Sequence, residues 1–393
     1  DNRRSRGLGD VYKRQVDLVT TGTGTLTIST GADIVTTGSA GNGSNNNGGA
    51  GGAVTLNTAN TAVTLNDTSI QTGGGTKAGS GTDGAGGTIT ISDPLTLATG
   101  GVTLDTGSTA GGVTISSTIN GAVDLDITSG TGAVAIEGAV GGTAALATLD
   151  VNALSGTGTI EVTDIGDGNP SAGVTGLTRL GNVNTGTLTL DGSNYDFGGG
   201  FTLGSGTYTL SGSTGAFTST GDVSFLGNVV VDGTFSVDSG GGDITIAGNI
   251  TGTDGDEIVT LTDGTGGDGA GTITIGGTIG NTAGSTSNIK SVTLTGDTAI
   301  SLGGDITTTT AATSSIDING NVTLTSNVTI DADQHSGDNV DFNGTINSDS
   351  TARNLTIKTS GGAVVIQGAI GTSNALSALD INTTEDGGGG NTG

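Results

Sequence analysis

Short alternations of apolar and polar residues recur along this chain and divide it into similar units. The segment GAVAIEGAVGGTAALATLDVNA at 132–153 matches GAVVIQGAIGTSNALSALDINT at 362–383, with Val, Ile or Leu of the first always facing Val, Ile or Leu of the second. Both follow the pattern G-x-h-x-h-x-G-x-h, a variable loop and h-x-x-h-x-h, where h is apolar. Further copies begin near Val113, Gly242, Gly271 and Val340, and adjacent copies start about 21 to 29 residues apart. Such self-similarity is the signature of a repeat architecture.

The alternation predicts which side chains face inward. Side chains two residues apart lie on the same face of a strand, so we expect Ile273 and Ile275 inside and Thr272 and Thr274 in water. One repeat cannot bury its apolar face alone, whereas stacked coils about 4.8 Å apart form parallel sheets around a continuous thin core. We therefore predict an all-β chain that folds as a parallel β-helix (β-solenoid) with irregular Gly-rich loops.

A central glycine recurs in each unit where the alternation would place another inward residue. We expect these glycines to adopt positive φ and turn the chain between faces of a coil. They are Gly138, Gly248, Gly277, Gly344 and Gly368.

Composition tests two alternatives to the solenoid. The chain has 80 Gly and only 2% aromatic residues, which raises the alternative of disorder, but its apolar residues alternate strictly and its mean hydropathy is +0.03. An antiparallel sandwich would use hairpins, for which the Gly-rich turns at Ser239–Gly242 and Thr265–Gly271 are candidates. The recurrence of one unit favours the solenoid.

The chain divides into three parts. Residues 10–15, DVYKRQ, are a translation of the transposase end used in sequencing adapters, so we interpret 1–15 as an adapter-derived or non-native segment. The alternative is that the Lys and Arg residues of this segment form a basic arm that binds nucleic acid or a membrane. Residues 16–383 are predicted as continuous β-solenoid repeats, and 384–393 as a Gly-rich truncated end. We expect an internal fragment of a longer protein.

Several segments differ from the repeat. The low-complexity stretches at 39–52 and 71–87 are expected to be solvated loops, with exposed binding loops as the alternative. Nearly all aromatic residues lie within 186–235, where an internal stack is favoured over a sugar-binding groove because Phe outnumbers Tyr and Trp is absent. Thr-x-Thr pairs recur, as an ice-binding face requires, but we expect the unequal loops to prevent the rows from registering.

Catalytic, cofactor-binding and metal-binding residues are all predicted to be none. The single histidine, His335, has no second His or Cys for a metal or a triad. Lyases of this architecture combine clustered Asp with Lys or Arg, but the cations after residue 15 are widely separated: Lys77, Arg179, Lys290, Arg353 and Lys358. A carboxylate pair of the glycosidase kind is left open.

No cofactor is expected, and weak Ca²⁺ binding is left open at three acidic loops, Asp254–Glu257, Asp263–Asp268 and Asp331–Asp341. The segment GGDGAGTIT at 266–274 departs from the calcium-binding nonapeptide because Gly271 stands where Asp is needed. The net charge of −27 disfavours nucleic acid as a partner. No apolar run is long enough to span a membrane.

The segment GTLTLDGSNYDFGGGFTLGSGTYTL at 186–210 resembles the strand repeat of autotransporter passengers, although Tyr195 falls one place early. The G-x-h-x-h-x-G-x-h copies resemble the repeats of filamentous-haemagglutinin-type adhesins. This resemblance covers most of 16–383 and implies a β-helical bacterial surface adhesin.

We therefore expect an extracellular structural or adhesive solenoid of a large bacterial surface or secreted protein, without enzymatic activity. Host or environmental surface glycans or proteins are the expected partners, and the chain is expected to be monomeric. A polysaccharide-acting β-helix enzyme is the alternative, and an ice-binding solenoid is a further one.

Overall fold

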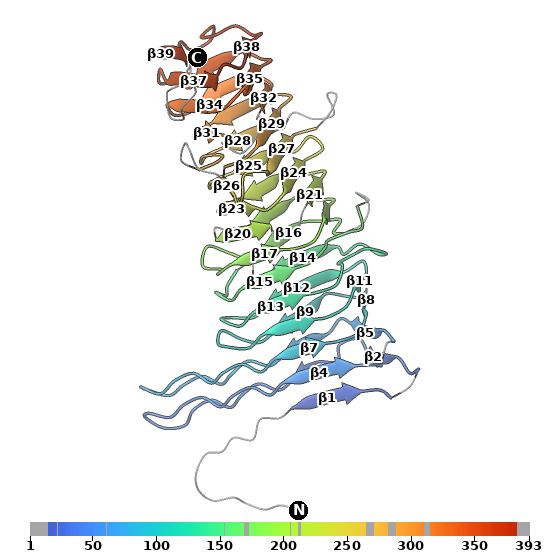
Figure 1. Cartoon of the computed structure of the whole chain (residues 1–393). Helices are drawn as coiled ribbons and strands as arrows, with labels where there is room; N and C mark the ends of the chain where they lie inside the picture. The colour runs from blue at the N-terminus through green and yellow to red at the C-terminus, as the bar shows by residue number, and fades with distance from the viewer. Residues whose placement is uncertain are drawn as a thin grey trace, which may run out of the picture.

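The computed structural model describes residues 15–21, 23–59, 61–152, 154–168, 173–204, 206–210, 214–264, 271–281, 288–309 and 315–382. In these residues the chain winds repeatedly around one long axis and builds a rod (Figure 1). All the strands pair in parallel, and no helix occurs in this part of the chain. The predicted fold class is confirmed: the chain is an all-β parallel solenoid.

Each winding contributes to three faces, which we call A, B and C in the order in which the chain visits them. Face A consists of β1 (Val16–Val19), β4 (Val54–Asn57), β7 (Ile89–Ile91), β10 (Val113–Ile115), β13 (Val134–Ile136), β15 (Ile160–Val162), β17 (Leu188–Leu190), β20 (Thr207–Leu210), β23 (Asn228–Val231), β26 (Ile250–Gly252), β31 (Ile306–Thr307), β34 (Val328–Ser336), β37 (Asn354–Ser360) and β39 (Ala378–Asn382).

Face B consists of β2 (Leu26–Ile28), β5 (Val63–Asn66), β8 (Leu95–Thr99), β11 (Ile119–Asn120), β18 (Asn194–Phe197), β21 (Thr214–Ser219), β24 (Thr234–Asp238), β27 (Ile258–Thr262), β29 (Ser291–Thr295), β32 (Ser315–Asn319), β35 (Asn339–Phe342) and β38 (Val364–Ile366). Face C, a single 13-stranded sheet, consists of β3 (Ile34–Val35), β6 (Ser69–Gln71), β9 (Val102–Asp105), β12 (Asp124–Thr128), β14 (Thr148–Val151), β16 (Thr178–Leu180), β19 (Phe201–Leu203), β22 (Val223–Phe225), β25 (Ile244–Ile246), β28 (Thr272–Ile275), β30 (Ala299–Leu302), β33 (Val322–Leu324) and β36 (Ile346–Ser348).

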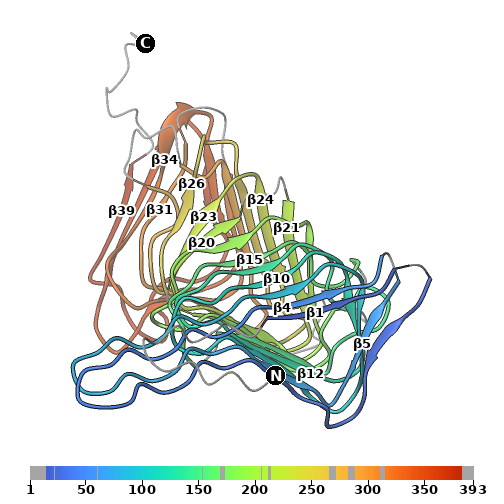
Figure 2. The same cartoon turned by 90° about the horizontal axis from the view of Figure 1, so that it is seen from below.

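In some windings faces A and B have no regular strand, and a single residue in a parallel β-bridge continues the face. Val140 and Ile165 link β11 to β18 on face B by successive parallel bridges. Ile279 links β26 to β31 on face A in the same way. All three faces therefore extend along the rod, and Figure 2 shows the windings overlying one another when the stack is seen from below.

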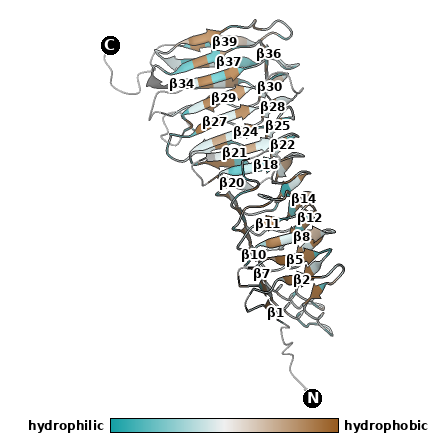
Figure 3. Cartoon of the chain, turned by 90° about the vertical axis from the view of Figure 1, so that its right-hand side faces the viewer, coloured by the Kyte–Doolittle hydropathy of each residue, from teal (hydrophilic) through white to brown (hydrophobic). Residues whose placement is uncertain are grey.

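The core lies between the three faces and contains the inward residues of the strands, except at the end of the stack, where Leu379 and Ile381 of β39 are 41% and 42% exposed. Ile273 and Ile275 are 0% and 1% exposed, whereas Thr272 and Thr274 on the same strand are half-buried and face outward, as predicted. Apolar bands consequently alternate with polar ones along the strands (Figure 3). Because each layer contacts only the layers above and below, the core has no centre and its stability is distributed along the axis.

The repeat unit proves to be three-sided. In the copy at 132–153, Val134 and Ile136 lie on face A, Val140 on face B and Leu149 on face C. The copy at 362–383 starts one face later, with β38 on face B and β39 on face A. The same residue pattern thus occurs on different faces, because each face requires only a strand of alternating apolar and polar residues followed by a corner.

The expected reason for the central glycines is wrong. Gly138, Gly248, Gly277, Gly344 and Gly368 do lie at corners, but none has positive φ. Close contact between windings requires them instead. A Cβ at Gly277 would lie 2.3 Å from the carbonyl oxygen of Gly248, and one at Gly368 would lie 2.0 Å from that of Gly344. Stacked corners approach so closely that a side chain cannot fit.

The loops absorb large differences in winding length. Val16 pairs with Val54 and Leu188 pairs with Tyr208, so windings range from 38 residues down to 20. The longest windings carry the low-complexity stretches, which form a projection that we call the glycine arm, residues 36–52 and 72–87 (Figures 1 and 2).

The glycine arm is held together by backbone hydrogen bonds. The amide of Gly38 donates to the carbonyl oxygen of Gly73, and that of Gly75 donates to Gly49, each at 2.8 Å. A Cβ at Gly38 would lie 1.9 Å from the carbonyl oxygen of Gly49. The low-complexity composition therefore permits backbone segments to pack against one another, and these loops are not merely solvated excursions.

The aromatic residues at 195–235 form the predicted internal stack. Tyr195 stacks on Phe217 with ring centroids 4.7 Å apart, and Phe217 also meets Phe201, Phe225 and Phe235 at 5.4, 5.4 and 5.6 Å. All five rings are at most 1% exposed. They fill the interior of these windings and do not form a surface groove.

Candidate functional site

Many acidic and amide side chains join one winding to the next. The Asn249 side chain accepts a hydrogen bond from the Thr278 amide at 2.9 Å, and the Asp243 carboxylate accepts one from the Thr272 amide at 2.8 Å. Such bonds satisfy corner amides that no sheet partner reaches. Much of the abundant Asp and Asn therefore has a structural use.

Two arginines are committed to ion pairs. Arg179 forms a two-pronged pair with Asp150 on face C, with 2.7 Å between Nε and Oδ1. Asp126 lies one winding below Asp150, and burial together with repulsion from Asp150 raises its pKa. Arg179 is therefore held on face C by Asp150, in a column that also contains the repelled carboxylate of Asp126.

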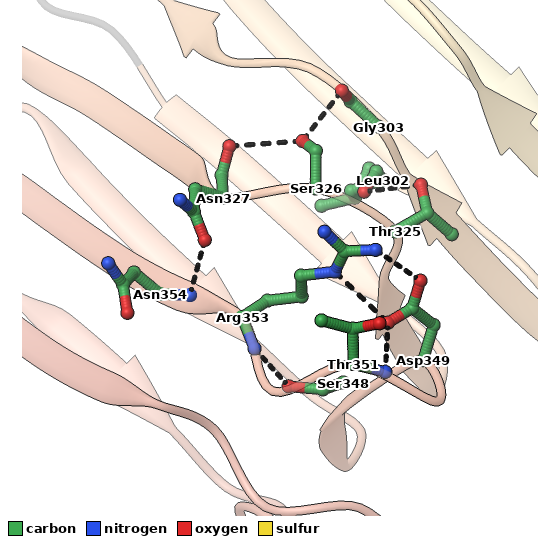
Figure 4. A network of polar contacts seen from close by, with 10 residues as sticks. All are labelled: Leu302, Gly303, Thr325, Ser326, Asn327, Ser348, Asp349, Thr351, Arg353 and Asn354. Atoms are coloured by element: carbon green, nitrogen blue, oxygen red, sulfur yellow. Dashed lines mark hydrogen bonds and ion pairs between the residues drawn. The ribbon is translucent and has the colours of Figure 1, made fainter.

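The second pair closes the loop between β36 and β37 (Figure 4). Arg353 donates from Nη2 to Asp349 at 2.7 Å, and the hydrogen bond from Arg353 lowers the pKa of Asp349. The Arg353 amide donates to Ser348 Oγ at 2.9 Å, and the Asn354 amide donates to Asn327 Oδ1 at 3.0 Å. The network anchors a turn to the winding below it.

The three acidic loops considered for Ca²⁺ have different roles. Asp254, Asp256 and Glu257 bring their oxygens within 4.8 Å of one another. Glu257, however, is fully buried and accepts the amides of Asp254 and Gly255 at 2.8 and 2.9 Å, so it shapes the loop. Hydrogen bonding with Asp254, and repulsion from it, raises the pKa of Asp256.

In the second loop, the buried Asp263 carboxylate accepts the Asp297 amide at 2.9 Å, while 265–268 lie outside the described residues. In the third, Asp317 and Asp341 stand in register on face B, and burial and the neighbouring carboxylate raise the pKa of Asp317. His335 lies in β34, and its side chain is outside the described part. The sequence predicted neither the contact of Asp263 with Asp297 nor the pairing of Asp317 with Asp341, because both depend on the register between windings.

A polar groove of about 430 Å³ runs along face A across β26, Ile279, β31 and β34. It is lined by Asn249, Thr251, Thr278, Gly280, Asn281, Asp305, Thr307, Thr329 and Asp331. Asp331 forms its deep end, because its side chain is 7% exposed and lies 3.5 Å from Lys358 Nζ. Asp305 Oδ1 accepts the Thr329 amide at 2.6 Å.

Gly280 leaves the middle of this groove without a side chain. Thr251, Gly280 and Thr307 follow the bridged residues Ile250, Ile279 and Ile306 in successive windings, so they occupy one outward row. Gly280 has φ of +87°, and a Cβ on it would lie 2.0 Å from the Thr307 carbonyl oxygen. The backbone therefore excludes a side chain from the middle of the row, and Thr251, Gly280 and Thr307 all line the groove.

Face C carries a row of hydroxyl groups that the sequence analysis did not expect. Pairing places six outward residues in register: Thr202, Ser224, Thr245, Thr274, Ser301 and Thr323. The expectation that unequal loops would prevent such rows is wrong. The additional residues lie in loops between the faces, so the paired strands keep their register.

No protein-family model matches the chain, and neither a curated protein nor a solved structure was found to be similar to it. Within the described residues, no helix has the length and apolar character needed to cross a membrane. The fold places the chain among parallel β-solenoid proteins, and its function is inferred from its surfaces.

Proposed function

We propose that this chain is a structural and adhesive solenoid segment of a large bacterial protein, displayed at the cell surface or secreted. One observation carries the proposal: a single layered core extends from β1 to β38 with three continuous outer faces. Such a rod separates two points in space and presents repeated surface along its length. Spacing and display require no catalytic residue.

The chemistry of the chain supports an extracellular setting. There is no cysteine, so no disulfide can lock the chain during export. The net charge of −27 and the hydroxyl-rich outer faces resist nonspecific association. The resemblance of 186–210 to autotransporter passenger repeats, which folds here as β17 to β20, agrees with this proposal.

Adhesion is tested by coating beads with residues 16–393 and measuring their attachment to cells and their binding on a glycan array. We expect saturable attachment that disappears in a variant whose windings are disrupted, such as Ile275→Asp. Attachment that survives loss of the fold, or no attachment by the folded chain, contradicts an adhesive role.

A polysaccharide-acting enzyme is the second candidate, because the groove on face A contains the carboxylates of Asp305 and Asp331. We favour binding over catalysis, since Asp305 is hydrogen-bonded to a backbone amide and Asp331 is paired with Lys358. Release of reducing ends from neutral polysaccharides, abolished in both Asp→Asn variants, would establish the enzyme instead.

A further inference from the structure

The polar groove on face A has the dimensions of a binding site. Its volume of about 430 Å³ falls within the range of small-ligand pockets. The lining residues come from four successive windings, which at about 4.8 Å per winding extend over roughly 14 Å of the rod. A ligand that filled it would be elongated and would lie parallel to the axis.

The lining chemistry defines what such a ligand must offer. Carboxylates only accept hydrogen bonds, whereas threonine hydroxyls and asparagine amides both donate and accept. The groove provides all three kinds of group over successive windings, and none of the described residues that line it is aromatic or bulky and apolar. A matching ligand therefore carries many hydroxyl groups along its length.

The charge of the groove further limits the class of ligand. Asp305 and Asp331 both line the groove, Lys358 offsets the charge of Asp331, and the whole chain has a net charge of −27. A uronic acid, sialic acid or sulfated sugar would be repelled by the Asp305 carboxylate and by the negative field of the whole chain. The Asp331 side chain is 7% exposed and lies 3.5 Å from Lys358 Nζ, and a carboxylate in an ion pair keeps lone pairs that a ligand hydroxyl group can reach.

We propose that this groove binds a linear neutral oligosaccharide lying along the solenoid axis, with Thr251 and Thr307 on either side of Gly280 and Asp331 accepting hydroxyl hydrogen bonds at the deep end. This inference rests on the proposed adhesive function and names the class of receptor. It assigns recognition to face A, in the windings of β26, β31 and β34.

The test uses the full chain on an array of neutral, amino-sugar and uronic-acid oligosaccharides, followed by calorimetric titration with the best neutral one. Thr251→Trp fills the groove from an outward position and leaves the core intact. Thr293→Trp is the matched control, because Thr293 is an outward, half-buried residue of β29 on face B. Circular dichroism and melting curves confirm that both variants fold.

We expect binding to neutral glycans, at least a tenfold loss of affinity in Thr251→Trp, and unchanged affinity in Thr293→Trp. Asp331→Asn should weaken binding by about tenfold, the value of a hydrogen bond to a charged group. Unchanged affinity in Thr251→Trp, or binding confined to anionic glycans, overturns the assignment.

Cell attachment is measured with the same proteins. Attachment that persists in Thr251→Trp refutes the groove as the adhesive site and leaves the adhesive function standing. A chain that binds neither glycans nor cells overturns both.

Discussion

Replacing Phe217 with Leu removes the ring at the centre of the aromatic stack while keeping the position apolar. Phe217 has four ring neighbours with centroids 4.7 to 5.6 Å away. Aromatic pairs contribute about 0.5–1.5 kcal/mol each beyond burial, and they are not additive when they share one ring. Together with the small cavity, we expect a loss of about 2–4 kcal/mol.

Phe342 provides the control, because it is also fully buried but has no aromatic contact among the described residues. Its replacement by Leu should cost about 1–1.5 kcal/mol, as a nearly volume-conserving exchange does. Long repeat arrays need not unfold in a single step, so the assay is hydrogen exchange resolved by segment. Equal losses of protection around β21 and around β35, or a larger loss in the Phe342 variant, would refute the role assigned to the stack.

Three further predictions follow from the windings. Gly277→Ala should lower the melting temperature, because the added Cβ would lie 2.3 Å from the carbonyl oxygen of Gly248 in the neighbouring winding. Gly101→Ala should not lower it, because its added Cβ has no atom closer than 3.9 Å. Equal melting temperatures for the two variants would contradict this role of Gly277. Ile275→Asp should lower the free energy of unfolding by several kcal/mol because it buries a charge. Ile366→Asp should lower it less, because Ile366 is only partly buried in an end winding. Equal losses for the two variants in denaturant titrations would count against the layered core. Asp317 has a folded-state pKa raised above its ordinary value of 3.8, so its charged form destabilises the fold at pH 7 and this cost is lost as the pH falls toward 3.8. Asp317→Asn should therefore be more stable than the unaltered chain at pH 7, and the difference in melting temperature should shrink on acidification; a difference that stays constant or has the opposite sign contradicts the reasoning.

Local alternation was sufficient to predict the fold and the direction of individual side chains. The pattern around Ile273 and Ile275 specifies which residues are buried without any knowledge of their neighbours, because the period of a strand is fixed at two. The internal position of the Phe217 cluster was also predictable, since a solenoid surface offers no reason to collect Phe. The role of the corner glycines was not predictable, because the close contact of Gly277 is with Gly248, which lies in a different winding.

The candidate groove could not be predicted for the same reason. Thr251, Gly280 and Thr307 are separated by 29 and 27 residues, and intervening loops of unequal length hide their alignment. The hydroxyl row on face C is likewise invisible until the register is known. Local propensity determines which residues face outward, whereas pairing between windings determines which outward residues become neighbours.

Windings of unequal length pair in parallel register, and cysteine cross-linking tests this pairing directly because the chain has no cysteine of its own. Thr274 and Ser301 are register partners on adjacent windings, and Thr323 lies one winding further on. Adjacent windings place Cα atoms about 4.8 Å apart, within reach of a disulfide, whereas two windings separate them by roughly 9.6 Å. We predict that the double variant Thr274→Cys/Ser301→Cys forms an intramolecular disulfide under mild oxidation and that Thr274→Cys/Thr323→Cys does not. Failure of the first pair to cross-link, or equal cross-linking of the second, would contradict the register.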